Sequence, residues 1–244
     1  MPMPFDATLK NLARENPGAF LAAFDRPPRE AVTLLNVDLS TVTTAADFVV
    51  GLGDPLQEIL HIDFQASASA TKHADVLVYN TLLYRHYRVP VHSVVVLLRS
   101  QAAHPNLNGT VSFAARPERG KMDFGYEVVR LWERSADDLL TGDVGAAPLA
   151  MLANVPAGMP LEDGLAAIAQ RLVDRLEREL PRDLARKLLT AAFVLTGLRV
   201  RRGAAQEVFR KVRAMKESDT YLAIMDEGRE EEATTALFEV LERR

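Results

Sequence analysis

The chain contains no cysteine. This absence excludes disulfide bonds, thiolate metal sites and cysteine nucleophiles. No apolar run approaches the length that spans a bilayer, and the first residues lack the profile of a signal peptide. No internal repeat of solenoid period is present either. We therefore expect a cytoplasmic protein that does not enter a membrane.

Hydrophobic residues make up 48% of the 244 residues, which is typical of a folded chain. Apolar periodicity predicts helices at 5–24 (with a break at Pro17 and Gly18), 75–87, from 161 onward and 182–200, and strands at 32–37, 91–98, 109–115 and 124–132. We expect the last two strands to extend the sheet, and the helix at 182–200 to stop at a polar segment, 201–203. The pattern divides the chain into an α/β core, 1–155, and a mainly helical C-terminal region, 156–244.

The segment 47–65, DFVVGLGDPLQEILHIDFQ, has the pattern of a β-hairpin. Gly and Pro residues separate two runs rich in Val, Ile and Leu. If the loop is centred near Pro55, Asp47 falls opposite Asp63. A slip of one residue would move Asp47 to the other face of the sheet.

The second strand of this hairpin alternates between apolar and polar side chains. Leu60, Ile62 and Phe64 share one face, together with Glu58 at the strand start, while His61, Asp63 and Gln65 share the other. Two carboxylates directly across a ladder repel each other, and a divalent cation would reverse that effect. Carboxylate and amide oxygens suit Mg²⁺ or Mn²⁺. Alternatively, this face is simply the solvated side of an antiparallel strand.

The run AADFVVGLGDPLQEILHIDFQAS and the following DVLVYNTLLYRHYRVPVHSVVVLL resemble the Rpn family of recombination-promoting, transposase-like nucleases. That family belongs to the PD-(D/E)XK nuclease superfamily. Later segments that resemble it are YEVVRLWE, PLAMLA and SDTYLAIMDEGREEE. The resemblance implies a restriction-endonuclease-like α/β fold, with a mixed central sheet flanked by helices and a mainly helical C-terminal extension.

The resemblance also implies catalytic roles for Asp47, Asp63 and Gln65. Asp47 and Asp63 would bind Mg²⁺ with the carbonyl of Phe64, and the metal would activate a water for phosphodiester hydrolysis. The superfamily more often has Glu at the position of Asp63 and Lys at that of Gln65, and Gln supplies no positive charge. Lys72 is the nearest replacement, and the alternative interpretation is that Lys72 is an ordinary exposed loop lysine.

His61, on the same face, could contact phosphate or transfer a proton, or it could simply face solvent.

Basic residues are unevenly distributed despite a net charge of −4. Residues 171–216 contain thirteen Lys or Arg against five Asp or Glu, whereas residues 217–244 contain three against nine. This asymmetry suggests a basic surface that binds DNA beside an acidic tail, or helix faces whose charges pair locally. Arg199, Arg201 and Arg202 are the least locally paired and are candidates for DNA contact.

The helix predicted at 75–87 ends in an aromatic and basic cluster. Arg85 and Arg88 are further candidates for nucleic-acid contact, as is Lys72. Tyr79, Leu83 and Tyr87 recur every four residues, so this stripe could instead be packing that leaves the arginines exposed.

Three functions are compatible with the sequence. The first is a Mg²⁺-dependent DNA endonuclease of recombination or mobile-element type. The second is a catalytically weakened relative that binds DNA or a protein partner. In the third, the C-terminal helices form an interface of a homo-oligomer.

Overall fold

A computed structural model describes residues 4–35, 48–114, 120–156 and 158–212. The helices are α1 (Pro4–Glu15), α2 (Pro17–Ala23), α3 (Lys72–Tyr87), α4 (Ala136–Thr141), α5 (Leu161–Glu179), α6 (Arg182–Thr196) and α7 (Arg202–Arg210), with 3₁₀ helices η1 (Ser100–Ala102), η2 (Leu131–Glu133) and η3 (Val144–Leu152). The strands are β1 (Val32–Leu34), β2 (Phe48–Leu52), β3 (Glu58–Gln65), β4 (Val91–Leu97), β5 (Thr110–Ala114), β6 (Lys121–Gly125) and β7 (Glu127–Arg130).

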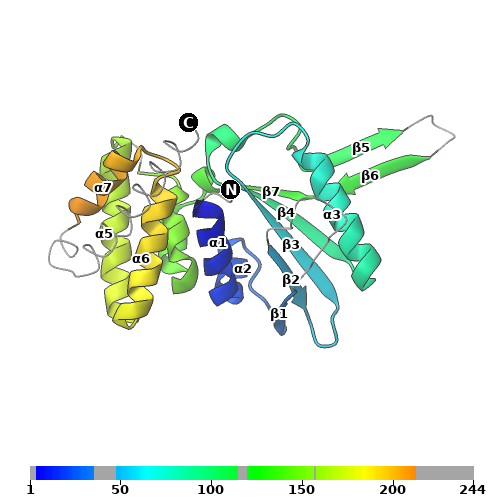
Figure 1. The fold of residues 1–244 in the computed structure, drawn as a ribbon, viewed down its shortest axis with the longest axis horizontal. Coiled ribbons are helices and arrows are strands. Elements are labelled where there is room, and N and C mark those ends of the chain that lie inside the picture. The colour runs from blue at the N-terminus through cyan, green and yellow to red at the C-terminus, as the bar shows by residue number, and fades with distance from the viewer. Residues whose placement is uncertain (1–3, 36–47, 115–119, 157, 213–244) are drawn as a thin grey trace, which may run out of the picture.

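The main sheet is mixed and has five strands in the order β1-β2-β3-β4-β7. The pairs β1–β2 and β2–β3 are antiparallel, whereas the pairs β3–β4 and β4–β7 are parallel. Parallel neighbours require a crossover connection, and α3 supplies it between β3 and β4. Figure 1 shows the sheet between α1 and α2 on one side and α3 on the other. The predicted mixed sheet flanked by helices is therefore confirmed.

The hairpin of β2 and β3 has the register expected from the sequence. Phe48 lies opposite Ile62 and Val50 opposite Leu60. The turn between the strands contains Gly53, whose φ of +91° is a conformation that glycine adopts without a side-chain clash. Asp47 itself lies outside the described residues, so its position opposite Asp63 stays a prediction.

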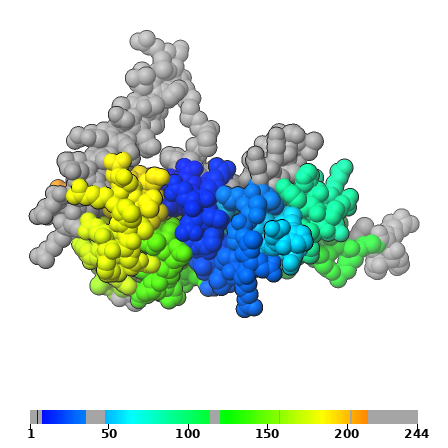
Figure 2. Space-filling view, turned by 90° about the horizontal axis from the view of Figure 1, so that it is seen from below, coloured from blue at the N-terminus to red at the C-terminus, as the bar shows by residue number. Residues whose placement is uncertain are grey.

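The apolar face of β3 packs against the N-terminal helices. Leu60, Ile62 and Phe64 are buried, and the ring of Phe64 meets that of Phe20 of α2 edge to face, with centroids 6.3 Å apart. In Figure 2, the N-terminal segment lies between α6, in yellow, and the strands of the hairpin. This packing confirms the alternation predicted for β3.

The second face of the sheet lies under α3. Val76 of α3 shares a hydrophobic cluster with Val95 and Leu97 of β4, and Leu83 shares another with Val49 and Ile59. Polar side chains on this face are therefore enclosed between sheet and helix wherever α3 covers them.

The strands predicted at 109–115 and 124–132 do not both extend the main sheet. β5 and β6 form a separate two-stranded ribbon, and β7 alone joins β4. The chain changes partners at Tyr126, whose N–H donates to Gly109 at the ribbon base, while Glu127 already pairs with Val94. Figure 1 shows the ribbon projecting beyond α3.

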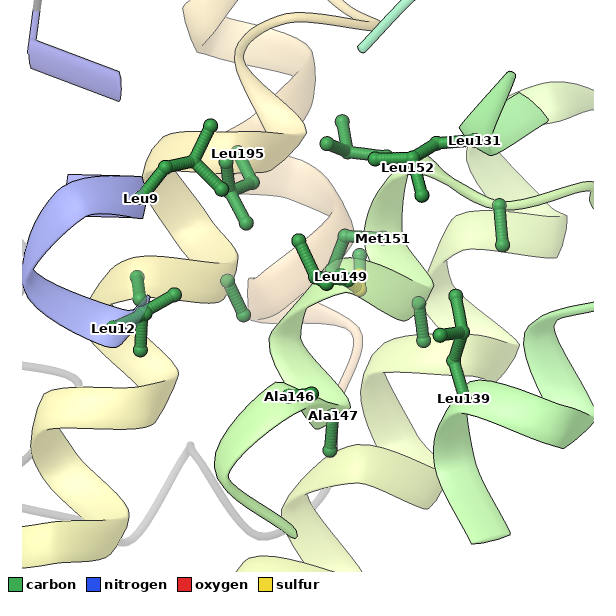
Figure 3. Close-up of a cluster of buried hydrophobic side chains, with 14 of the residues drawn as sticks. Leu9, Leu12, Leu131, Leu139, Ala146, Ala147, Leu149, Met151, Leu152 and Leu195 are labelled. Carbon is green, nitrogen blue, oxygen red and sulfur yellow. The ribbon is translucent and has the colours of Figure 1, made fainter. Parts of the chain in front are cut away.

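The C-terminal helices share a hydrophobic cluster with the N-terminal helices and the sheet. Figure 3 shows Leu9 and Leu12 of α1, Leu195 of α6, and Leu149 and Met151 of η3 gathered in this cluster. The predicted domain boundary after residue 155 stays a prediction. The helix predicted at 182–200 ends at Thr196, ahead of the polar segment 201–203, and a further helix, α7, begins at Arg202 and buries Phe209 against Phe193, with ring centroids 5.5 Å apart.

None of the helices in the described part of the chain combines the length and the hydrophobicity needed to cross a membrane. The acidic tail, 217–244, lies outside the described residues, and so does its expected role in a homo-oligomer.

Candidate functional site

The candidate site lies where β3 ends and α3 begins. Asp63 stands near the end of β3, on the face that α3 covers, and its strand neighbour is Val95 of β4. The chain then passes through residues 66–71 and enters α3 at Lys72. Lys72 therefore follows Asp63 by only nine positions, and the chain direction brings it back toward β3.

Lys72 forms an ion pair with Asp63. Its Nζ atom donates to Oδ2 of Asp63 at 2.7 Å, and the two side chains are only 15% and 4% exposed, respectively. The interpretation of Lys72 as an exposed loop lysine is therefore wrong. A buried carboxylate requires compensation of its charge, and Lys72 provides it.

The second oxygen of Asp63 has a different environment. Among the described residues, Oδ1 is buried and accepts no hydrogen bond. Buried polar atoms in folded proteins nearly always have a partner, so an exception marks a position for a further ligand. A cation or a water molecule would satisfy this oxygen.

Burial raises the pKa of Asp63, because loss of solvent disfavours the charged form, and nearby Asp75 acts in the same direction. Lys72 opposes this rise through its charge and its hydrogen bond, and Lys10 of α1 adds a smaller opposing effect. The carboxylate therefore depends on nearby positive charge to stay ionised.

Gln65 and Phe64 lie at the same end of β3. The Gln65 side chain turns toward its own loop, where Nε2 donates to the carbonyl of Ser67. The ring of Phe64 points to the opposite face, so only its backbone belongs to the site. Nε2 carries a second hydrogen and Oε1 is an acceptor, so the amide can bind a water while it keeps its bond to Ser67.

Two segments border this end of the sheet. Arg99 donates through Nε to the carbonyl of Ala66 at 2.6 Å, and Asn106 donates through Nδ2 to the carbonyl of Ala70 at 3.0 Å. The loop after β4 is thus hydrogen-bonded to the loop that leads from Asp63 to Lys72.

A group of three or more His, Asp or Glu side chains suited to a metal ion does not occur within the described residues. Asp47, the second predicted carboxylate ligand, lies outside them. The unpartnered Oδ1 of Asp63 is nevertheless a hard oxygen of the kind that Mg²⁺ and Mn²⁺ bind. The described residues therefore supply part of the predicted ligand set, with the Phe64 carbonyl still a prediction.

His61 does not face solvent. It is fully buried beneath α3, with its ring 5.6 Å from that of Tyr79 and its Nδ1 atom 3.2 Å from Oγ of Ser93. A fully buried ring cannot contact a substrate phosphate directly. The interpretations of His61 as a solvated strand residue and as a direct phosphate contact are therefore wrong, whereas its role in proton transfer stays a prediction.

The residues predicted to contact nucleic acid do not gather on one surface. Arg85 and Arg88 are exposed at the far end of α3 from Lys72, whereas Arg199 and Arg201 lie near the ends of α6 and α7, across the molecule (Figure 1). The Arg202 side chain is outside the described set. Tyr79 and Leu83 are buried, which confirms the packing stripe on α3.

Arg199 has a structural role. Its guanidinium donates to the carbonyl of Ala153, just after η3, and lies 3.5 Å from that of Met151. Burial lowers the pKa of Arg199. The guanidinium of this half-buried residue turns inward to these carbonyls, and its predicted contact with DNA stays a prediction.

A second charged cluster lies at the opposite end of the parallel strands. Arg26, after α2, donates to Glu127 at the start of β7 and to Nε2 of His92 in β4, the latter at 2.7 Å. Burial and the charge of Arg26 lower the pKa of His92, while Glu127 and Glu58 oppose that shift. These partners are 66 and 101 positions from Arg26, so no local pattern could have revealed the cluster.

A local signal could have identified Lys72. A basic side chain in the first turn of a helix opposes the helix dipole, which favours acidic groups there. Such a residue needs a nearby carboxylate, and Asp63 is the acidic group just before it on the polar face of the preceding strand.

Comparison of the chain with family models, curated proteins and solved structures gives no match.

Proposed function

We propose that this protein is a Mg²⁺-dependent DNA endonuclease with a restriction-endonuclease-like fold. The observation that carries the proposal is the contact of Lys72 with Asp63 at 2.7 Å. It places a positive charge beside the predicted metal ligand, where Gln65 cannot supply one. The family resemblance of the hairpin and the mixed sheet between helices are compatible with this fold.

The proposed roles follow from the chemistry of each group. Asp63, Asp47 and the Phe64 carbonyl would hold the metal, and Oδ1 of Asp63 is the described atom most suited to it. A bound Mg²⁺ lowers the pKa of a coordinated water and polarises the scissile phosphate. Lys72 would stabilise negative charge that develops during phosphodiester hydrolysis. Gln65 would orient a water through its amide group.

Plasmid nicking in the presence of Mg²⁺ or Mn²⁺ tests this proposal. We expect the purified protein to nick supercoiled DNA and Asp63→Asn to abolish nicking. Lys72→Met should reduce the nicking rate by about 10²-fold or more, the effect typical of losing one charge-stabilising group. Lys72→Arg keeps a positive charge and should retain part of the original nicking rate. EDTA should stop the reaction.

A matched control comes from the exposed pair of Lys211 and Asp163, whose atoms Nζ and Oδ1 lie 2.8 Å apart. Lys211→Met and Asp163→Asn remove the same chemical groups far from β3 and should nick normally. If Asp63→Asn nicks DNA as fast as the original protein, the activity belongs to another site or to a contaminant, and the proposal fails.

One observation favours a second candidate, a nuclease-like protein that binds DNA without cutting it. Lys72 already neutralises Asp63, so a cation would have to share the carboxylate with an ammonium group. Binding of a labelled duplex in fluorescence anisotropy, unchanged by EDTA and accompanied by no nicking, would select this alternative. A Mn²⁺ complex detected by EPR, and lost in Asp63→Asn, would select the enzyme.

A further inference from the structure

A chain of polar side chains runs beneath α3. Nδ2 of Asn80 donates to the carbonyl of Val91 at 2.9 Å and to Oγ of Ser93 at 3.0 Å. The same Oγ lies 3.2 Å from Nδ1 of His61. Ser93 and His61 are 2% and 0% exposed, respectively, so the chain is enclosed by protein.

The donor and acceptor roles in this chain fix its geometry. Only the amide nitrogen of Asn80 can donate to the Val91 carbonyl, and its second hydrogen points to Ser93. The orientation of the Asn80 amide is therefore determined. Because α3 reaches β4 through Asn80, and β4 reaches β3 through Ser93 and His61, the chain joins three elements at one level of the fold.

The chain and the ion pair connect the same helix to the same strand. Asn80 follows Lys72 by eight residues on α3, about 12 Å along the helix axis and on the same helix face. His61 precedes Asp63 by two residues on the same face of β3. Asp63 and Lys72 therefore lie on the same side of this chain of polar side chains, toward the end of β3 and the start of α3.

Lys72 cannot set its own position. Its side chain has four rotatable carbons and a compact charge, so the ammonium reaches Asp63 only if the first turn of α3 is held at the correct height. Apolar contacts such as those of Val76 are non-directional. The hydrogen bonds from Asn80 add a fixed distance and direction between α3 and β4.

We infer that Asn80, Ser93 and His61 are positioning residues, which fix the height and rotation of α3 and so hold the Lys72 ammonium on Asp63. The inference rests on the proposed function in that Lys72 and Asp63 are its site. It assigns His61 to alignment of the site, without contact to substrate.

The test measures the protection of Lys72 directly. Full-length protein is treated with formaldehyde and cyanoborohydride, and mass spectrometry follows methylation of each lysine. Ser93→Ala and Asn80→Asp should make Lys72 react about fivefold faster, the change in open population that loss of one hydrogen bond produces. Exposed Lys187 and Lys211 should react as before.

Thr81→Ala provides the matched control, since Thr81 lies on the exposed side of α3 and bonds only the Leu77 carbonyl of its own helix, at 2.8 Å, within the described contacts. We expect Lys72 in this variant to be methylated as slowly as in the original protein. Unfolding midpoints of all variants are measured by circular dichroism, and methylation is carried out well below them, so that general unfolding does not contribute.

Nicking kinetics then separate this inference from the proposed function. We expect Asn80→Asp to lower kcat with little change in KM, because substrate binding is untouched. Faster methylation of Lys72 without any nicking by the original protein would support the positioning role and reject the nuclease. Unchanged protection of Lys72 in both Ser93→Ala and Asn80→Asp would overturn the positioning role, whatever the activity.

Discussion

Arg26 donates a hydrogen bond to His92, with Nη2 2.7 Å from Nε2 of the ring. A guanidinium can only donate, so Nε2 is the acceptor and His92 is neutral in the folded protein. The contact joins the segment after α2 to the start of β4. The protonation state of His92 therefore affects the free energy of unfolding.

This contact predicts a loss of stability at mildly acidic pH. The pKa of His92 is lowered from 6.5, so the unfolded chain binds a proton before the folded protein does. The free energy of unfolding should fall as the pH drops from about 6.5 through the lowered pKa. His92→Gln keeps an acceptor for Arg26 and should flatten this part of the profile in urea titrations. His86→Gln, at an exposed position on α3, should leave the profile unchanged.

Asp63 predicts a pH dependence of the opposite sign. Its pKa is raised from 3.8, so above that pH the folded protein keeps a proton that the unfolded chain has lost. Stability should decrease as the pH rises from about 3.8 to the raised pKa, and remain level above it. Urea titrations of Asp63→Asn should lack this decrease, while Asp163→Asn should retain it. Identical profiles for Asp63→Asn and the original protein would contradict the prediction.

Removal of Lys72 should destabilise the fold. Lys72→Met leaves a buried carboxylate without its cation, which costs about 3 kcal/mol in the free energy of unfolding. Adding Asp63→Leu should recover much of this loss, because an apolar pair needs no charge compensation. Denaturant unfolding of the single and double variants measures the coupling. Additive effects of the two substitutions would mean that the ion pair does not stabilise the fold, and Lys211→Met is the exposed control.

Arg199 should matter for stability and not for DNA affinity. Arg199→Ala leaves the carbonyl of Ala153 without its donor, which lowers the free energy of unfolding by about 2 kcal/mol. Arg201→Ala removes an exposed charge at the start of α7 and should leave the unfolding midpoint unchanged. Thermal unfolding and duplex binding of both variants test the assignment. A drop in affinity for Arg199→Ala at unchanged stability would restore its role in DNA contact.

Local sequence pattern predicted the elements in which periodicity is strong. The alternation at Leu60 and Ile62 located β3 and its apolar face, and the glycine-containing turn gave the register that pairs Phe48 with Ile62. These features depend on neighbours within a few residues. For the same reason the helices α5 and α6 were predicted, since each has an apolar stripe of its own.

Features that depend on distant contacts were missed. Nothing next to His61 indicates that α3 covers it, so a strand of alternating polarity resembled a solvated one. The inward turn of Arg199 depends on carbonyls 46 and 48 residues earlier in the chain. The Lys72 contact spans nine residues, yet it requires the chain to leave β3 and return along a helix, which periodicity alone does not describe.

The hydrogen bond from Asn106 to Ala70 has a consequence for how this fold can diverge. It joins the loop after β3 to the loop after β4, and the hydrogen bond from Arg99 to Ala66 joins the two loops a second time. Loops on a rigid scaffold ordinarily change length independently. Here an insertion in one loop would break its bond to the other, so in relatives of this chain the two loops should lengthen or shorten together.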